Sequence, residues 1–149
     1  MVRYNYAAFL FNQSRFKEAL KQIQVSSDDL GYGRRPQAFY IMGLCQSRLN
    51  KSEQALSSFE KATHLEPRFA DPYLEIGEIY FGQQKYFNAK RVLDQYALLA
   101  QSTAKSLWLS VRLEGRLGNR DKASSQGLQL KNLFPYSKEN VEYQKWLNR

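Results

Sequence analysis

The chain has 149 residues, of which 43% are hydrophobic, and carries a formal net charge of +8 at pH 7. No apolar run approaches the roughly 18 residues that a membrane-spanning helix needs, and the single cysteine, Cys45, excludes an internal disulfide and a cysteine zinc cluster. The charge is uneven, with half of the excess in residues 104–137, and this favours acidic partners without forming the continuous basic stripe of a nucleic-acid-binding protein. We therefore expect one soluble helical domain over residues 1–149 that does not bind nucleic acid.

Residues 1–35 are predicted to hold a first helix pair within residues 1–30. Apolar residues of the first helix recur three and four apart, and Ala19 begins the buried face of the second helix. A longer connection is expected from Ser26 to Arg35. Its Gly31-Tyr32-Gly33 sequence lacks the preceding strand and the glycine spacing of a phosphate-binding loop.

Residues 36–69 carry the clearest pattern in the chain. The apolar spacing predicts two amphipathic helices, Gln37–Leu49 and Ser52–Leu65, joined by a short polar turn at Asn50 and Lys51. Pro67 is expected to end the second helix, because proline has no amide hydrogen and clashes with the preceding turn.

Small and aromatic residues of this stretch predict how its two helices pack. Gly43 and Ala55 are expected at the crossing of the helices, where larger side chains would push the axes apart, with Phe39 and Phe59 beside them. Measured from residue 36, the positions 4, 7, 8, 20, 24, 27 and 32 match the tetratricopeptide (TPR) repeat. They are occupied by Phe39, Met42, Gly43, Ala55, Phe59, Ala62 and Pro67.

Two further stretches follow with the same spacing. Residues 70–103 are predicted to form a helix pair within Asp71–Leu99, and residues 104–137 a more degenerate pair within Ala104–Leu133. Gly127 costs about 1 kcal/mol of helix propensity relative to alanine, so we expect it to admit a close neighbour. Ser137–Leu147 is predicted to be a short helix that caps the exposed end of the last repeat.

Four alanines set the repeat length: Ala19, Ala55, Ala89 and Ala123 follow one another at intervals of 36, 34 and 34 residues. We expect each to mark an equivalent close contact within its own hairpin. The predicted fold is therefore all-α, a right-handed α-solenoid of about four TPR helix hairpins with a C-terminal capping helix.

Catalytic chemistry finds little support in the residues. His64 is the only histidine and has no serine or cysteine motif beside it, so a surface or packing role is expected. Asp71, Glu75 and Glu78 could approach a cation, but no further ligand completes a metal set, and an acidic patch is the preferred interpretation. Cys45 is expected to be buried and reduced. We predict no enzyme activity and no cofactor.

The inner surface of a TPR array is built from the first helix of each hairpin, and large apolar groups recur at those positions here. They predict a groove for an extended or helical peptide, with arginines that select acidic partners. The alternative is that the same side chains pack between adjacent helices. The candidate residues are Tyr4, Phe11, Tyr40, Leu44, Arg48, Leu74, Glu78, Phe81, Trp108, Arg112 and Arg116.

Three segments go beyond the generic repeat, and the last is the most specific because TPR packing does not require its Gly-x-Gln-Leu-Lys sequence. They are Asn5–Leu10 with Arg15–Ala19, Ser106–Leu113, and Gly127–Ser137 with the later Glu142–Gln144. In these segments the chain resembles the type IV pilus biogenesis and stability TPR lipoproteins, the PilF/PilW pilotin family.

The resemblance implies a non-enzymatic protein that helps the type IV pilus secretin reach the outer membrane and assemble there. It further implies a lipid-anchored protein at the periplasmic face of the outer membrane. The family's signal peptide, lipid-bearing cysteine and earlier TPR units are not matched, so the chain is expected to correspond to the C-terminal part of such a protein. The alternative is a cytoplasmic TPR scaffold that binds another peptide or self-associates.

Overall fold

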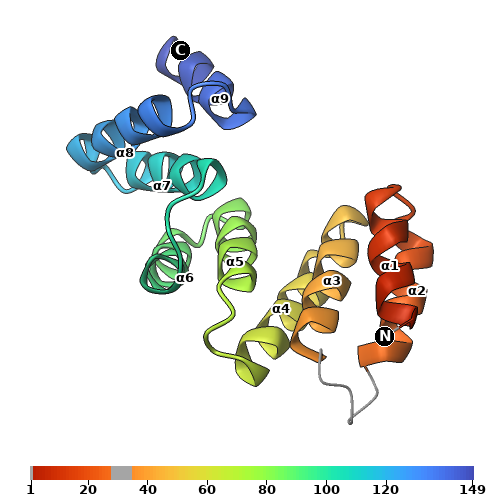
Figure 1. The fold of residues 1–149 in the computed structure, drawn as a ribbon. Coiled ribbons are helices and arrows are strands. Elements are labelled where there is room, and N and C mark those ends of the chain that lie inside the picture. The colour runs from red at the N-terminus through yellow and green to blue at the C-terminus, as the bar shows by residue number, and fades with distance from the viewer. Residues whose placement is uncertain (1, 28–34) are drawn as a thin grey trace. The chain divides into compact units, whose positions relative to one another are not determined.

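A computed structural model describes residues 2–27 and 35–149. Within these ranges every regular element is a helix, as Figure 1 shows, and the predicted all-α class is confirmed. The helices are α1 (Val2–Asn12), α2 (Phe16–Ser27), α3 (Arg35–Arg48), α4 (Ser52–Leu65), α5 (Asp71–Gly82), α6 (Tyr86–Leu99), α7 (Ala104–Arg116), α8 (Arg120–Leu133) and α9 (Lys138–Leu147).

The helices form two compact units, Met1–Ile76 and Gly77–Arg149, and the boundary between them falls within α5. We call them unit 1 and unit 2 and describe each by itself. In unit 1, α3 packs against both α2 and α4, and in unit 2, α7 packs against α6, α8 and α9. The expected single domain over residues 1–149 stays a prediction.

The predicted helix boundaries agree closely with the structure. The expected helix Ser52–Leu65 coincides with α4, and Glu66 caps its C-terminus one residue before Pro67. The expected connection between the first two hairpins was too long at both ends, because α2 continues to Ser27 and α3 begins at Arg35. The Gly31-Tyr32-Gly33 sequence lies outside the described residues.

The crossing of the two helices in a hairpin is tight where the sequence predicted it. A Cβ atom on Gly43 would lie 2.6–2.8 Å from three ring atoms of Phe59, so only glycine lets that fully buried ring sit against α3. Each of the repeat alanines is the fourth residue of its helix and is buried, with 0% of Ala19, Ala55 and Ala89 and 5% of Ala123 exposed. The predicted equivalence of these four positions is confirmed.

The turn within each hairpin repeats a backbone feature that the sequence pattern did not reveal. One residue of each turn has a left-handed conformation, with φ between 60° and 82°: Ser14, Asn50, Gln84 and Gly118. The next residue then donates its amide to a carbonyl five residues earlier, as in Lys85 N to Tyr80 O at 2.9 Å. This conformation reverses the chain while it satisfies a carbonyl at the helix end.

We expect the Gly118→Ala substitution to destabilise the protein by about 1 kcal/mol, because an L-residue is disfavoured at a positive φ. A Cβ atom at Gly118 would meet nothing within 4 Å, so the cost comes from the backbone alone. Gln84→Gly relieves the same strain in the preceding hairpin and is expected to stabilise by up to about 1 kcal/mol. Urea unfolding followed by circular dichroism measures both, and a neutral Gly118→Ala would contradict this interpretation.

Helix α9 closes the end of unit 2. Its N-terminus is fixed by Ser137, whose Oγ accepts a hydrogen bond from the Asn140 amide at 3.0 Å. Tyr143 of α9 is buried and lies against Gly127 of α8, where a Cβ atom would overlap the tyrosine ring. The expected close neighbour of Gly127 is therefore found, and it is the capping helix itself.

Candidate protein-binding surfaces

Three predicted residues of unit 1 follow one another at intervals of four on α3, so they share one face of that helix. Tyr40 is half-buried, with its ring centroid 5.3 Å from that of Phe69 and 5.9 Å from that of Phe59. Leu44 is also half-buried, whereas Arg48 is exposed. This face therefore combines packed apolar groups with a cation that reaches solvent.

Of the remaining predicted residues of unit 1, Tyr4 and Phe11 are half-buried and Leu74 is buried. Tyr4 and Phe11 of α1 pack against the core cluster of unit 1, and the guanidinium of Arg48 lies 5.8 Å from the Phe11 ring. Leu74 of α5 is buried, with 7% of its side chain exposed. For Leu74 the structure favours the packing alternative, and we leave it out of the proposed surface.

In unit 2 the predicted residues meet around Arg112 of α7. Its Nη2 donates to Glu78 Oε1 at 2.9 Å, and its guanidinium lies 5.0 Å from both the Phe81 and the Trp108 rings. Arg112 therefore pairs with a carboxylate of its own chain, and its role in selecting an acidic partner stays a prediction. Arg116, one turn further along α7, is exposed and retains that possibility.

Trp108 joins this cluster to the capping helix. Its ring centroid lies 6.2 Å from those of both Tyr143 and Trp146 of α9, with an edge-to-face arrangement to Trp146. Gly115 makes room for the same contact, since a Cβ atom there would lie 3.2 Å from the Trp146 ring. Trp108 is thus half-buried, and its main contacts hold α9 against α7.

A buried carboxylate that the sequence analysis did not single out ties three helices of unit 2 together. Glu114 of α7 is 2% exposed and accepts hydrogen bonds from Lys90 Nζ of α6 at 2.6 Å and from Asn119 Nδ2 at 2.6 Å. Lys122 Nζ of α8 lies 3.3 Å away. An acidic residue in the buried register of α7, one turn after Val111, was the signal that could have revealed it.

Two effects act in opposite directions on the pKa of Glu114. Burial acts to raise the pKa of Glu114, but hydrogen bonds from Lys90, Asn119 and Lys122 outweigh it, so the pKa lies below its ordinary value. The carboxylate is therefore charged at neutral pH. The two lysines more than balance the single carboxylate, and the cluster is a structural element of unit 2.

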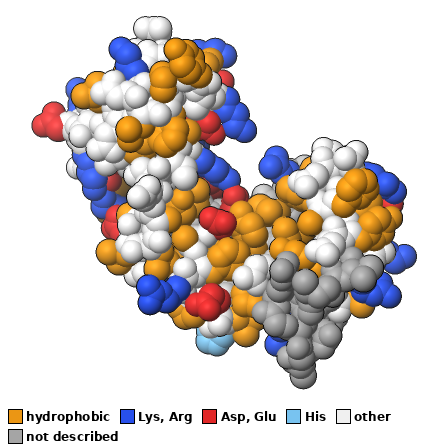
Figure 2. Space-filling view, viewed as in Figure 1, with side chains coloured by type: hydrophobic (Ala, Val, Ile, Leu, Met, Phe, Trp, Pro, Cys, Tyr) orange, Lys and Arg blue, Asp and Glu red, His pale blue; other side chains and the backbone are white. Residues whose placement is uncertain are grey.

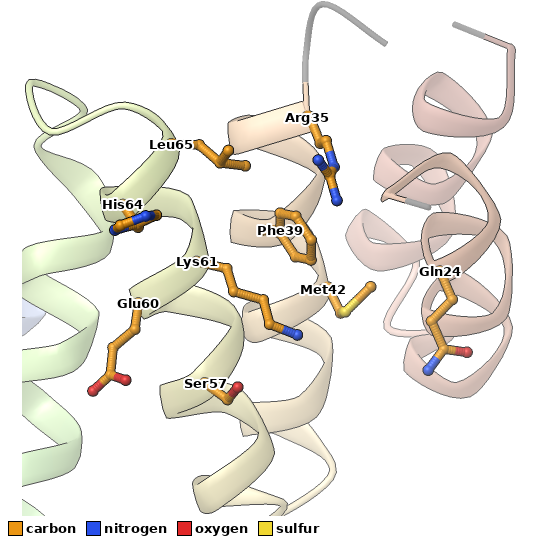
Figure 3. Close-up of a pocket in the computed structure, with 9 residues that line it drawn as sticks. All are labelled: Gln24, Arg35, Phe39, Met42, Ser57, Glu60, Lys61, His64 and Leu65. Atoms are coloured by element: carbon orange, nitrogen blue, oxygen red, sulfur yellow. The ribbon is translucent and has the colours of Figure 1, made fainter. Parts of the chain in front are cut away.

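Unit 1 contains an open groove that the sequence analysis also missed. It lies between α2 and α4, with α3 as its floor, and has a volume of about 860 Å³. Figure 3 shows the side chains that line it, with Phe39 and Met42 of α3 at the centre. Both are core residues with only 7% and 8% of their surface exposed. An excess volume between the second helices of two hairpins cannot be inferred from the spacing of apolar residues.

The groove brings two cations to one aromatic ring. The guanidinium of Arg35 lies 5.4 Å and the ammonium of Lys61 5.5 Å from the centroid of Phe39. In Figure 3 these side chains approach Phe39 from different sides, while the Glu60 carboxylate is directed away from them. Of the two, Lys61 is exposed, so its ammonium can meet an anion that arrives from solvent.

Two further candidate residues of the sequence analysis are Cys45 and His64. Cys45 is buried, as expected, and burial raises the pKa of its thiol to about 11, so it stays protonated at neutral pH. His64 is exposed and forms part of the groove rim; it is the pale blue side chain of Figure 2. Among residues 2–27 and 35–149, no group of three or more His, Cys, Asp or Glu side chains could hold a metal ion.

Comparison with known proteins identifies relatives of the chain. A family described as tetratricopeptide repeat matches residues 36–69. The type IV pilus assembly protein PilF of Pseudomonas aeruginosa is 35% identical over 140 residues, which make up 94% of this chain and 56% of that protein. The chain thus spans little more than half the length of this curated relative.

Solved structures agree with the sequence match. A structure described as a functional characterization of Pseudomonas aeruginosa PilF aligns with a TM-score of 0.88 and 35% identity, covering 97% of this chain and 65% of that one. The crystal structure of PilW, described as a widely conserved type IV pilus biogenesis factor, aligns with a TM-score of 0.82 over 96% of this chain and 66% of its own; at 21% identity it supports the fold alone. The predicted TPR solenoid fold is confirmed. None of the described helices combines the length and apolar character needed to cross a membrane.

Proposed function

We propose that this chain, which is a PilF/PilW-like tetratricopeptide-repeat protein, assists assembly of the type IV pilus by binding the pilus secretin. It is a protein-interaction module, and we place it at the periplasmic face of the outer membrane in association with a lipid anchor. The 35% identity to PilF over 94% of this chain is the observation that carries the proposal.

The first helices of the hairpins offer the contact surface for this partner. In unit 1 the proposed surface consists of Tyr40, Leu44 and Arg48 on one face of α3, together with Tyr4 and Phe11 of α1. In unit 2 it consists of Arg116 and the cluster of Glu78, Phe81, Trp108 and Arg112. Half-buried aromatic groups beside exposed arginines suit a partner that presents apolar side chains flanked by acids, because rigid aromatic anchors bind at low entropic cost.

We expect the double substitution Arg48→Glu and Arg116→Glu to weaken binding of a purified periplasmic secretin fragment by about tenfold or more, because like charges then face the acidic partner. Both side chains are exposed, so the fold is expected to survive. Biolayer interferometry at two salt concentrations measures the effect, and circular dichroism checks the fold.

Arg91→Glu provides a matched control at an exposed residue of α6, a helix that contributes no residue to the proposed surface. It reverses one charge of the same type and is expected to change affinity by less than about twofold. If the folded chain did not bind the secretin fragment, the proposed partner would be wrong. If Arg91→Glu weakened binding as much per charge as the double variant, the proposed surface would be wrong.

A further inference from the structure

We propose that the groove between α2 and α4 is a second binding site, which takes an acidic peptide segment of another protein carrying a large apolar side chain among its carboxylates. It lies on the side of unit 1 formed by the second helices of the hairpins, whereas the surface proposed for the secretin is formed by the first helices. The two sites are therefore independent, and either can fail without the other.

Because the helix hairpins repeat, the groove of unit 1 can be compared with the corresponding space in unit 2. The equivalent groove of unit 2 lies between α6 and α8 over α7 and has a volume of about 200 Å³, against about 860 Å³ in unit 1. In unit 2 the ion pairs of Glu114 with Lys90 and Lys122 bridge the three helices and line this smaller space.

The residues that form these ion pairs in unit 2 are replaced in unit 1. At the positions that correspond by repeat spacing to Lys90, Glu114 and Lys122, unit 1 has Leu20, Gln46 and Gln54. Gln46 is buried and is satisfied within the second hairpin, where its Oε1 accepts a hydrogen bond from Ser58 Oγ at 2.6 Å. These three side chains are neutral and form no charged bridge, and none of them lines the groove of unit 1.

The lining then selects the chemistry of the occupant. Phe39 and Met42 form an apolar floor, which Leu65 extends, and an apolar side chain of a ligand would be desolvated there. Above the floor stand the cations of Arg35 and Lys61, held against Phe39. A ligand that satisfies both features has an apolar group with carboxylates on either side.

Lys61 is available to such a ligand. It is exposed, and no ion pair engages it within the described part of the chain. Glu60, the one carboxylate among the described residues of the lining, points away from the two cations in Figure 3. Ser57 of α4 also lines the groove and offers a neutral hydrogen-bonding group to a peptide backbone.

Fluorescence anisotropy tests this assignment with a labelled peptide, Glu-Asp-Glu-Phe-Glu-Asp-Glu, and two matched probes. One probe replaces phenylalanine by serine, and the other replaces every acid by lysine or arginine. We expect the first peptide to bind with an affinity that falls as salt is added, and both matched peptides to bind at least about tenfold more weakly. Equal binding of either matched peptide, or no binding of the first, would overturn the proposal.

Two natural reporters locate the bound peptide without any substitution. Met42 is one of only two methionines, and His64 is the only histidine, so their methyl and imidazole signals stand out in NMR spectra of the chain. Saturation with the acidic peptide is expected to shift both signals. If neither signal moves at saturation, the peptide binds elsewhere and the groove is not the site.

Lys61→Glu and Lys51→Glu form a matched pair of variants, because both reverse one exposed lysine of unit 1 and only Lys61 lines the groove. We expect Lys61→Glu to weaken peptide binding by about tenfold and Lys51→Glu by less than about twofold. Lys61→Gln serves as a second variant should Lys61→Glu disturb the fold. Equal loss in the Lys61 and Lys51 variants, or equal competition by a single-stranded oligonucleotide, would show general attraction of anions and overturn the assignment.

Discussion

Replacing Gly127 by alanine is expected to displace α9 and to lower the free energy of unfolding by about 1–3 kcal/mol, the usual range for overpacking a core. The added methyl group overlaps the ring of Tyr143, which is buried between α7 and α8 and cannot swing into solvent without losing its contacts with Trp108 and Trp146. By helix propensity alone, alanine would stabilise α8 by about 1 kcal/mol relative to glycine. A net decrease in the free energy of unfolding would therefore show the steric overlap with the Tyr143 ring.

A double-mutant cycle separates these two effects. In a Tyr143→Ala background the collision is absent, and Gly127→Ala is expected to be neutral or to stabilise by up to about 1 kcal/mol. Trp108 and Trp146 are the only tryptophans and both contact the α9 interface, so their fluorescence should shift to the red in Gly127→Ala. A destabilisation of equal size in both backgrounds would mean that Tyr143 does not fill the space beside Gly127.

Substituting Glu114 by alanine is expected to cost about 2–3 kcal/mol. The carboxylate is 2% exposed, and hydrogen bonds that involve a charged group contribute about 1.5–3 kcal/mol each. The side chains of Lys90 and Lys122 are 31% and 50% exposed. Water can therefore solvate their ammonium groups when Glu114 is removed, which reduces the loss of stability. Glu142→Ala, which removes the exposed pair with Lys145, is the control and is expected to change stability by less than about 0.5 kcal/mol.

The same network predicts a dependence of stability on pH. Because the pKa of Glu114 is lower in the folded chain than in the unfolded chain, the unfolded state binds the proton first as pH falls. The stabilisation by Glu114 is thus fully present above about pH 5 and is lost as pH falls through the folded pKa. The difference in unfolding free energy between the wild type and Glu114→Ala should narrow from pH 6 to about pH 3. A constant difference over that range would contradict the charged, hydrogen-bonded state of Glu114.

The hairpins could be predicted because the spacing of apolar and small residues that specifies them lies within each hairpin and recurs from one to the next. Apolar spacing located α4 to the residue, and the small residues Gly43 and Ala55 marked a crossing that the Phe59 ring confirms. Gly127 was recognisable as a close approach because glycine in a helix interior needs a reason. Which side chain would fill that space could not be read from spacing, since Tyr143 comes from a separate element.

The candidate surfaces were less predictable, because the contacts that each side chain makes with residues of other helices determine which groups a partner can reach. Repeat position placed Phe81, Trp108 and Arg112 on one predicted surface, but it could not indicate that Arg112 pairs with Glu78 of its own chain. The groove over Phe39 is an unfilled volume between α2 and α4. Unfilled space between two helices leaves no periodic signal in a sequence.

The most direct test of the proposed role is the amount of assembled secretin in the outer membrane of cells that lack the gene encoding this chain. We expect the heat-resistant secretin multimer to decrease in the outer-membrane fraction and to return when the gene is restored, but not when it carries Arg48→Glu and Arg116→Glu. An unchanged amount of multimer in the outer membrane of the deletion strain would contradict the proposal that this chain assists secretin assembly.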